Sequence, residues 1–212
     1  MTYTKRLGWV FLLCLAPNLY SGVILTENFE AATPGGGYTG AIPNTVFTVT
    51  GNNVDIVGDQ HGSYFLCSSG AGTNCLDMVG SGGAPNAVQS NAVFNILAGQ
   101  QYLLTFDSSG SGPNAGFVWN GSAVFGADIF LFSAVGGASG NAVTHQSFAF
   151  TASSTASGAH LTFNDFNAPN SVHGIELDNI VLQSVTAVPE PATFALAGLA
   201  TAGLWLRRRW KK

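Results

Sequence analysis

The central part of this chain lacks basic residues. All seven Lys and Arg residues lie at positions 5 and 6 or within 207–212, and none lies between Val23 and Val188. The same stretch holds ten acids, so a net charge of −4 for the full chain becomes −10 for this stretch. Nucleic-acid affinity depends on Lys and Arg contacts to phosphates, so we expect no nucleic-acid partner. Each acid must be solvated, hydrogen-bonded, or paired with a metal cation or a histidine.

The sequence also lacks the local motifs of common hydrolases and zinc sites. It contains no Gly-x-Ser-x-Gly and no His-Glu-x-x-His, and its four histidines are scattered without a His-x-x-x-His pair. We therefore expect neither an enzyme nor a zinc protein. A polysaccharide-acting hydrolase stays the less favoured alternative, because the two carboxylates of a glycosidase need no local spacing.

Residues 23–186 show no amphipathic helical repeat and are predicted to form one all-β domain. Short apolar segments such as 102–106, 129–132 and 175–182 alternate with clusters of Gly, Asn, Ser and Thr, which is typical of an antiparallel sandwich. Asn120-Gly121 predicts a two-residue hairpin turn. In the last strand, the period of two places Glu176 and Asp178 on the same face.

The first 22 residues have the pattern of a secretory signal peptide. Lys5 and Arg6 precede an apolar stretch over residues 7–16. This pattern predicts export and removal of residues 1–22 by signal peptidase.

The last 26 residues, 187–212, have three blocks in a fixed order. The apolar block, 192–206, has about 15 residues and would span roughly 22 Å as a helix, whereas a stable transmembrane helix needs about 20 residues. One interpretation of residues 187–212 is a simple C-terminal membrane anchor. The flanking blocks are the tripeptide Pro189, Glu190 and Pro191 and a basic end that begins with Arg207, Arg208 and Arg209.

This order of blocks resembles the PEP-CTERM sorting domain of exported proteins of Gram-negative bacteria. The resemblance implies a precursor held transiently in the inner membrane by a short C-terminal helix and then cleaved by an exosortase. It also implies a final place at the cell surface or in the extracellular matrix, associated with exopolysaccharide or biofilm.

Several fragments of the central domain are similar to secreted galactose-binding-like domains. The resemblance implies a two-sheet antiparallel jelly roll, a superfold that includes many carbohydrate-binding modules and no shared catalytic site. Such domains often carry a structural Ca²⁺, which implies Glu30 and Asp178 as ligands together with backbone carbonyls. The alternative is two solvated carboxylates. The fragments are 28–30, 51–58, 75–80, 97–107 and 177–180.

Candidate sugar-contacting aromatics and a disulfide complete the prediction. Trp119 is the one tryptophan left once both terminal signals are removed, and Tyr38 and Tyr64 lie in Gly-rich contexts, so each is a candidate platform for a pyranose. The alternative for all three is packing in the core. Cys67 and Cys75 are expected to form a disulfide after export, with two free thiols as the alternative.

Together these features predict an exported, non-enzymatic surface or matrix protein that binds exopolysaccharide or is embedded in it. The alternative is a structural or adhesive matrix module without a specific sugar site.

Overall fold

The structure is a computed structural model that describes residues 18–58, 74–80, 86–111, 118–135, 143–166, 174–188 and Gly198. The chain divides into a unit over Ser21–Val185 and a second unit made of the two terminal segments. The first unit is a β-sandwich. The predicted signal peptide and the sorting tail lie almost wholly outside the described residues. Among the described residues, no helix has both the length and the apolar character that crossing a bilayer requires.

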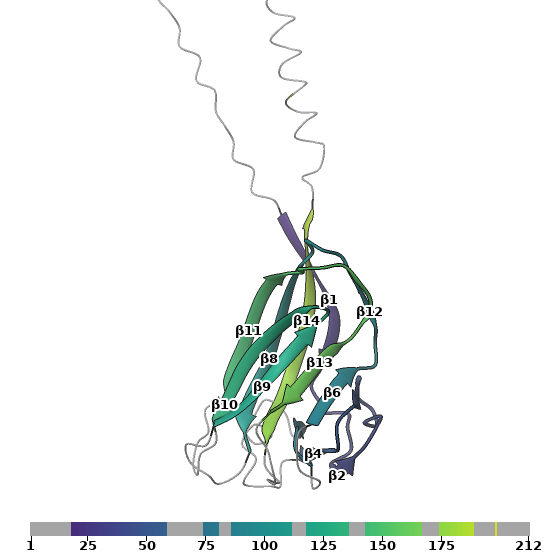
Figure 1. Cartoon of the computed structure of the whole chain (residues 1–212), viewed down its shortest axis with the longest axis vertical. Helices are drawn as coiled ribbons and strands as arrows, with labels where there is room; N and C mark the ends of the chain where they lie inside the picture. The colour runs from purple at the N-terminus through teal and green to yellow at the C-terminus, as the bar shows by residue number, and fades with distance from the viewer. Residues whose placement is uncertain are drawn as a thin grey trace, which may run out of the picture. The chain divides into compact units, whose positions relative to one another are not determined.

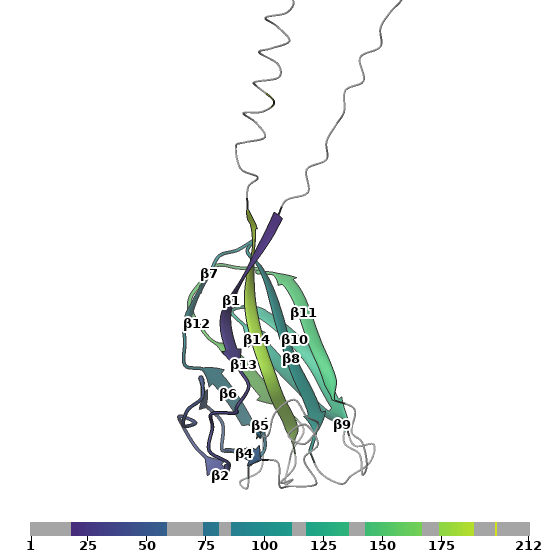
Figure 2. The same ribbon diagram turned by 180° about the vertical axis from the view of Figure 1, so that it is seen from behind.

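Two sheets make up the sandwich, and Figures 1 and 2 show them as two layers seen from opposite sides. Every strand pair with a described register is antiparallel. The seven-stranded sheet has the order β11 (Thr144–Thr151), β8 (Gln101–Gly110), β14 (Ile175–Val188), β5 (Asn74–Asp77), β4 (Val54–Gly58) and β2 (Gly35–Tyr38), with β1 (Asn18–Glu27) also pairing with β14. The five-stranded sheet has the order β10 (Asp128–Val135), β9 (Val118–Phe125), β13 (Leu161–Asp165), β6 (Asn86–Ser90) and β3 (Phe47–Val49). A small sheet pairs β12 (Ala156–Ala159) with β7 (Phe94–Ile96).

Aromatic side chains from both sheets fill the space between the layers. The ring of Phe106 on β8 lies 4.9 Å from the Phe132 ring on β10 and 5.1 Å from the Phe163 ring on β13, both edge-on. Edge-to-face pairs of this kind add about 0.5–1.5 kcal/mol beyond the apolar area that they bury. The alternating apolar residues of the sequence therefore form the core, and the predicted all-β sandwich is confirmed.

The last strand changes face at one residue. Ile175 and Leu177 point into the core, but so do Ile180 and Leu182, because the register of β14 against β8 shifts between Asp178 and Val181. Asn179 takes a positive φ of 50° at this bulge. An extra residue of this kind is the defining feature of a β-bulge, and a strict period of two does not predict it.

The predicted hairpin at Asn120-Gly121 is wrong. Strand β9 runs straight through both residues, and the chain reverses instead after Phe125, at Gly126 with a φ of 65°. Gly121 serves close packing: a Cβ there would stand 2.7 Å from the carbonyl oxygen of Asn164.

Candidate functional site

The predicted aromatic platform for a sugar does not exist at Trp119. Its side chain is 1% exposed and belongs to the core, so neither face of the indole is available to a ligand, and this prediction is wrong. Tyr38 on β2 is half-buried against the core, and its hydroxyl donates a hydrogen bond of 2.7 Å to the carbonyl oxygen of Thr33. Tyr64 lies outside the described residues.

The outer face of the five-stranded sheet carries uncharged side chains. They belong to the residues that alternate with the core positions of each strand, and they are hydroxyl, amide and aliphatic groups. We call this set the neutral face: Thr48, Ala87, Gln89, Asn120, Ser122, Val124, Ile129, Leu131, Ser133, Thr162 and Asn164.

The strand register arranges the neutral face in rows. One row crosses all five strands in the order Thr48, Gln89, Thr162, Val124 and Ile129, because each residue is the direct partner of the next. Side chains directly opposite each other on neighbouring strands have Cβ atoms about 4.5–5.5 Å apart. The neutral face is therefore a continuous surface that changes from polar groups on β3 and β6 to aliphatic groups on β10.

Two further cross-strand pairs of the neutral face are joined by hydrogen bonds between side chains. Asn164 donates from Nδ2 to the Ser122 hydroxyl at 3.1 Å, and the Ser133 hydroxyl donates to Asn120 Oδ1 at 2.9 Å. These contacts orient amide groups along the surface, where each keeps further hydrogen-bonding capacity.

Two hollows open along this sheet. The first has a volume of about 390 Å³ and is lined by Asn120, Leu131, Ser133 and Phe166, together with Gly121 and Phe132. Leu131 is 72% exposed and Phe166 is 52% exposed, so the hollow combines apolar surface with amide and hydroxyl groups. The second has a volume of about 430 Å³, and its lining includes Gln89, Thr162, Ser154 and His160.

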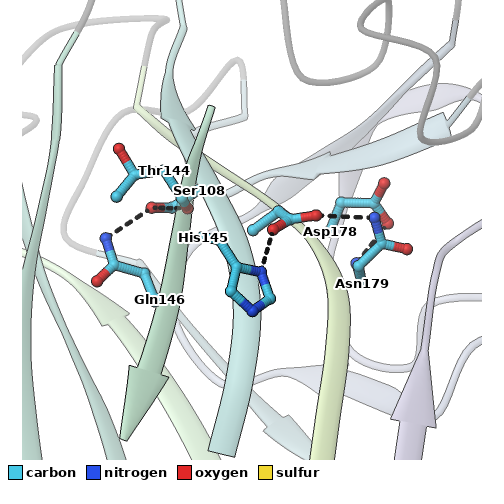
Figure 3. A network of polar contacts seen from close by, with 7 residues as sticks. Ser108, Thr144, His145, Gln146, Asp178 and Asn179 are labelled. Atoms are coloured by element: carbon cyan, nitrogen blue, oxygen red, sulfur yellow. Dashed lines mark hydrogen bonds and ion pairs between the residues drawn. The ribbon is translucent and has the colours of Figure 1, made fainter. Parts of the chain in front are cut away.

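The acids gather instead on the outer face of the seven-stranded sheet. Asp178 on β14 is the direct partner of Asp107 on β8, and Asp107 is the direct partner of His145 on β11. Nδ1 of His145 lies 2.8 Å from Asp107 Oδ1, and Asn179 donates from Nδ2 to Asp107 Oδ2 at 2.9 Å. Figure 3 shows His145, Asp178 and Asn179 along this network.

Asp178 is the most constrained acid of this network. It is 1% exposed, its Oδ1 accepts the backbone N–H of Asn179 at 2.7 Å, and its Oδ2 is buried without a hydrogen-bond partner. Burial, together with the neighbouring charges of Glu30, Asp107 and Glu27, raises the pKa of Asp178 from 3.8 to about 7, although the hydrogen bond from Asn179 acts to lower it. A buried carboxylate among like charges favours a proton or a cation.

The structure brings the two predicted calcium ligands, Glu30 and Asp178, into electrostatic contact. Asn74 fixes the segment that carries Glu30: its backbone N–H donates to Glu30 Oε1 at 3.1 Å, and its amide donates to the carbonyl oxygen of Ala32 at 3.0 Å. In the described part of the chain, no three His, Cys, Asp or Glu side chains converge on one point as a metal site. A Ca²⁺ here would therefore need carbonyl oxygens beside two carboxylates, which is a ligand set that Ca²⁺ accepts.

Cys75 lies on β5, is fully buried, and takes part in a disulfide. Its predicted partner, Cys67, lies outside the described residues, so the pairing of these two cysteines stays a prediction.

Comparisons with known proteins bear on the tail and on the fold. Residues 187–209 match the PEP-CTERM protein-sorting motif. The match confirms the resemblance of the tail, and this motif marks an exported protein that an exosortase processes. No curated protein matches the sequence of the chain.

Among solved structures, the arabinose-bound α-L-arabinofuranosidase MgGH51 has a TM-score of 0.50 and 10% identity over 77% of this chain and 27% of that chain. The Xyn10B xylanase of Clostridium thermocellum, bound to xylohexaose, has a TM-score of 0.47 and 13% identity over 80% of this chain and 30% of that chain. The xylan-binding domain of Xyn10C from Paenibacillus barcinonensis has a TM-score of 0.46 and 13% identity over 79% of this chain and 97% of that chain. This chain thus spans less than a third of the first two proteins. At 10% identity the similarity to MgGH51 shows the fold alone. The strand order of the two antiparallel sheets agrees with the predicted jelly-roll sandwich.

The sequence did not point to the neutral face. One signal was available, because the polar residues that alternate with core residues in 87–89, 120–124 and 162–164 are amides, hydroxyls and small groups, without a charge.

Proposed function

We propose that this protein is a non-enzymatic component of the cell surface or extracellular matrix, whose jelly-roll domain binds an uncharged polysaccharide on the neutral face. The observation that carries the proposal is that neutral side chains lie on one outer face of the sandwich and acidic side chains on the other. Amides, hydroxyls and aliphatic groups lie on the five-stranded sheet, while Asp107, Asp178 and their neighbours lie on the other sheet. The sorting motif supports delivery to the surface of a Gram-negative cell, which is where the domain would meet exopolysaccharide.

The neutral face has the two kinds of group that a sugar needs. A pyranose presents hydroxyls around its edge and C–H groups on its faces. The amides of Gln89 and Asn164 are donors and acceptors for the hydroxyls, and the exposed side chains of Leu131 and Phe166 offer apolar surface for the C–H groups. An uncharged polysaccharide also avoids repulsion by a domain of net charge −10.

Affinity electrophoresis in gels that contain an uncharged polysaccharide tests this proposal. We expect Asn164→Ala, Gln89→Ala and Leu131→Ser each to weaken the retardation of the exported protein by about tenfold, since losing one buried hydrogen bond or apolar contact costs about 1–1.5 kcal/mol. Ser147→Ala, on an exposed position of β11 in the other sheet, is the matched control and leaves retardation unchanged. Equal retardation of all variants and the wild type would place binding elsewhere.

The non-enzymatic part of the proposal is supported by the composition of the same face. Hydrolysis of a glycosidic bond requires two carboxyl groups on either side of the bond, and the residues of the neutral face supply none. Release of reducing ends from the producer's own polysaccharide would overturn this part and support a hydrolase.

A second candidate, a structural or adhesive module, is favoured by one edge of the sandwich. Strands β10 and β11 are each an edge strand of one of the two sheets and lie near each other (Figures 1 and 2). The ring centroid of Phe130 on β10 is 4.6 Å from that of Phe150 on β11. Both strands have eight residues without Lys or Pro, and Ile129 and Leu131 are exposed on β10. Unprotected edges of this kind favour pairing with another strand. Sedimentation analysis that shows self-association, abolished by Ile129→Lys, would support this candidate, whereas a monomer at all concentrations would reject it.

We also propose that Glu30 and Asp178 bind a structural Ca²⁺. The support is their proximity and the buried Oδ2 of Asp178, which has no hydrogen-bond partner. Thermal melting with calcium and with chelator tests this calcium site, and identical midpoints in the two buffers would reject it.

A further inference from the structure

A second group of carboxylates lies on the acidic outer face, on strands β4, β5 and β14. Asp55 is the direct partner of Asp77, and Asp77 is the direct partner of Glu176. The three side chains therefore follow one another across neighbouring strands, where like charges directly opposite are destabilising. Asp77 and Glu176 are both fully buried.

Nearby donors supply hydrogen bonds to both buried carboxylates. Asp77 Oδ1 accepts the backbone N–H of Val79 at 2.9 Å, and Glu176 Oε2 accepts the Ser109 hydroxyl at 2.5 Å. The other oxygen of Asp77, Oδ2, is buried and has no hydrogen-bond partner. Burial is the main cause that raises the pKa of Asp77, and the charges of Glu176 and Asp55 act in the same direction.

No Lys or Arg of the domain can supply a positive charge for this pair, because none lies between Val23 and Val188. A carboxylate in the interior without a compensating charge costs several kcal/mol. The unpartnered Oδ2 of Asp77 therefore requires a proton, a water molecule or a cation.

These three differ in how much charge they compensate. A proton on either residue, or shared between them, neutralises only one of the two carboxylates. A water molecule can donate to Oδ2, but it leaves two adjacent negative charges in the interior. A divalent cation compensates both charges and requires only oxygen atoms.

Further oxygens lie on the flank of the pair. An added Cβ at Gly80 would stand 2.6 Å from Asn53 Oδ1 and 2.7 Å from Asp55 Oδ1, so both oxygens point to the same place just beyond the end of β5. Asp55 also lines an open hollow of about 330 Å³ between β2 and β4. An all-oxygen environment of carboxylates, an amide and backbone carbonyls suits Ca²⁺.

We propose that Asp77 and Glu176 bind a second Ca²⁺ ion, separate from the ion at Glu30 and Asp178. The two carboxylates are its charged ligands, and amide, carbonyl and water oxygens complete the shell. Asp55 adds negative potential at the entrance. The ion joins β5 to β14 on the outer face, as the first ion joins the segment after β1 to β14.

The stoichiometry of Ca²⁺ binding tests the proposal. Equilibrium dialysis of the exported protein against Ca²⁺ is expected to give two ions per chain for the wild type. Asp77→Asn and Glu176→Gln are each expected to bind one ion, and so is Asp178→Asn, while Asp77→Asn combined with Asp178→Asn binds none. Circular dichroism of each variant confirms the β-fold.

The possible results separate the two sites. One ion in the wild type that is lost in Asp178→Asn but kept in Asp77→Asn overturns the second site and leaves the first. One ion that is lost in Asp77→Asn but kept in Asp178→Asn supports the second site and removes the first. No ion in the wild type overturns both. The wild-type stoichiometry alone therefore rejects a pair of sites even where a variant fails to fold.

Discussion

Replacing Asp178 by Asn is expected to stabilise the protein without calcium and to lose that advantage when calcium is present. In a chelator, ionised Asp178 is a buried charge whose pKa is raised from 3.8 to about 7. The difference is about 3 pKa units, or about 4 kcal/mol at 1.36 kcal/mol per unit. Asn is neutral, and its side-chain oxygen can still accept the N–H of Asn179. At pH 8 the variant is therefore more stable than the wild type by up to about 4 kcal/mol, or roughly 10 °C in Tm.

The pH dependence follows from the same shift. Since the folded pKa of Asp178 lies above the unfolded one, its protonated form stabilises the fold fully below about pH 4. This contribution is lost as the pH rises through about 7. In chelator, the wild type should thus lose stability between pH 4 and pH 8, and Asp178→Asn should lose less.

Saturating Ca²⁺ should remove this advantage of the variant. An ion present at about 1,000 times its dissociation constant stabilises the folded state by about 4.1 kcal/mol, and Asp178→Asn forfeits that contribution. Differential scanning calorimetry in chelator and in millimolar Ca²⁺ measures both effects. A variant that is no more stable than the wild type in chelator at pH 8 would refute the burial argument, and a variant equally stabilised in both buffers would refute the calcium ligand.

Three further predictions concern packing, the disulfide and the tail. Gly121→Ala should lower the free energy of unfolding by about 1–3 kcal/mol, because the new Cβ would overlap the Asn164 carbonyl; urea denaturation checks this, and an unchanged midpoint contradicts it. Replacing Cys67 or Cys75 by Ser should cost about 2–3 kcal/mol, since seven residues separate them; a non-reducing peptide map that shows two free thiols would reject the pairing. Intact-mass analysis of the exported form should show loss of the basic end that follows the motif at 187–209, and a surface form that retains Trp210 would exclude cleavage.

The sequence predicted the sheets better than the places where strands bend or turn. Alternation in the 102–106 and 175–178 segments identified the core faces, because burial of every second residue is a local pattern. The bulge at Asn179 and the passage of β9 through Asn120-Gly121 depend on contacts with other strands. The local turn preference of Asn-Gly predicts a hairpin there. In the structure Gly121 allows the close approach of β9 to Asn164, so packing between strands determines the conformation.

For the candidate sites too, the sequence predicts what depends on composition and misses what depends on contacts between distant strands. The absence of Lys and Arg predicted that the acids need other partners, and the structure brings Glu30 close to Asp178. Pairing of Asp77 with Glu176 joins strands about a hundred residues apart, which spacing in the sequence does not reveal. The flat indole of Trp119 suits contact with a sugar ring, yet burial of a large aromatic residue is the more common outcome.

Binding of an uncharged polysaccharide by the exported protein is the most direct measurement of the central claim. Affinity electrophoresis should show retardation in a gel that contains the uncharged exopolysaccharide of the producing cell, and Asn164→Ala should reduce that retardation while Ser147→Ala preserves it. Migration of the wild type that is unaffected by the polysaccharide would contradict the account.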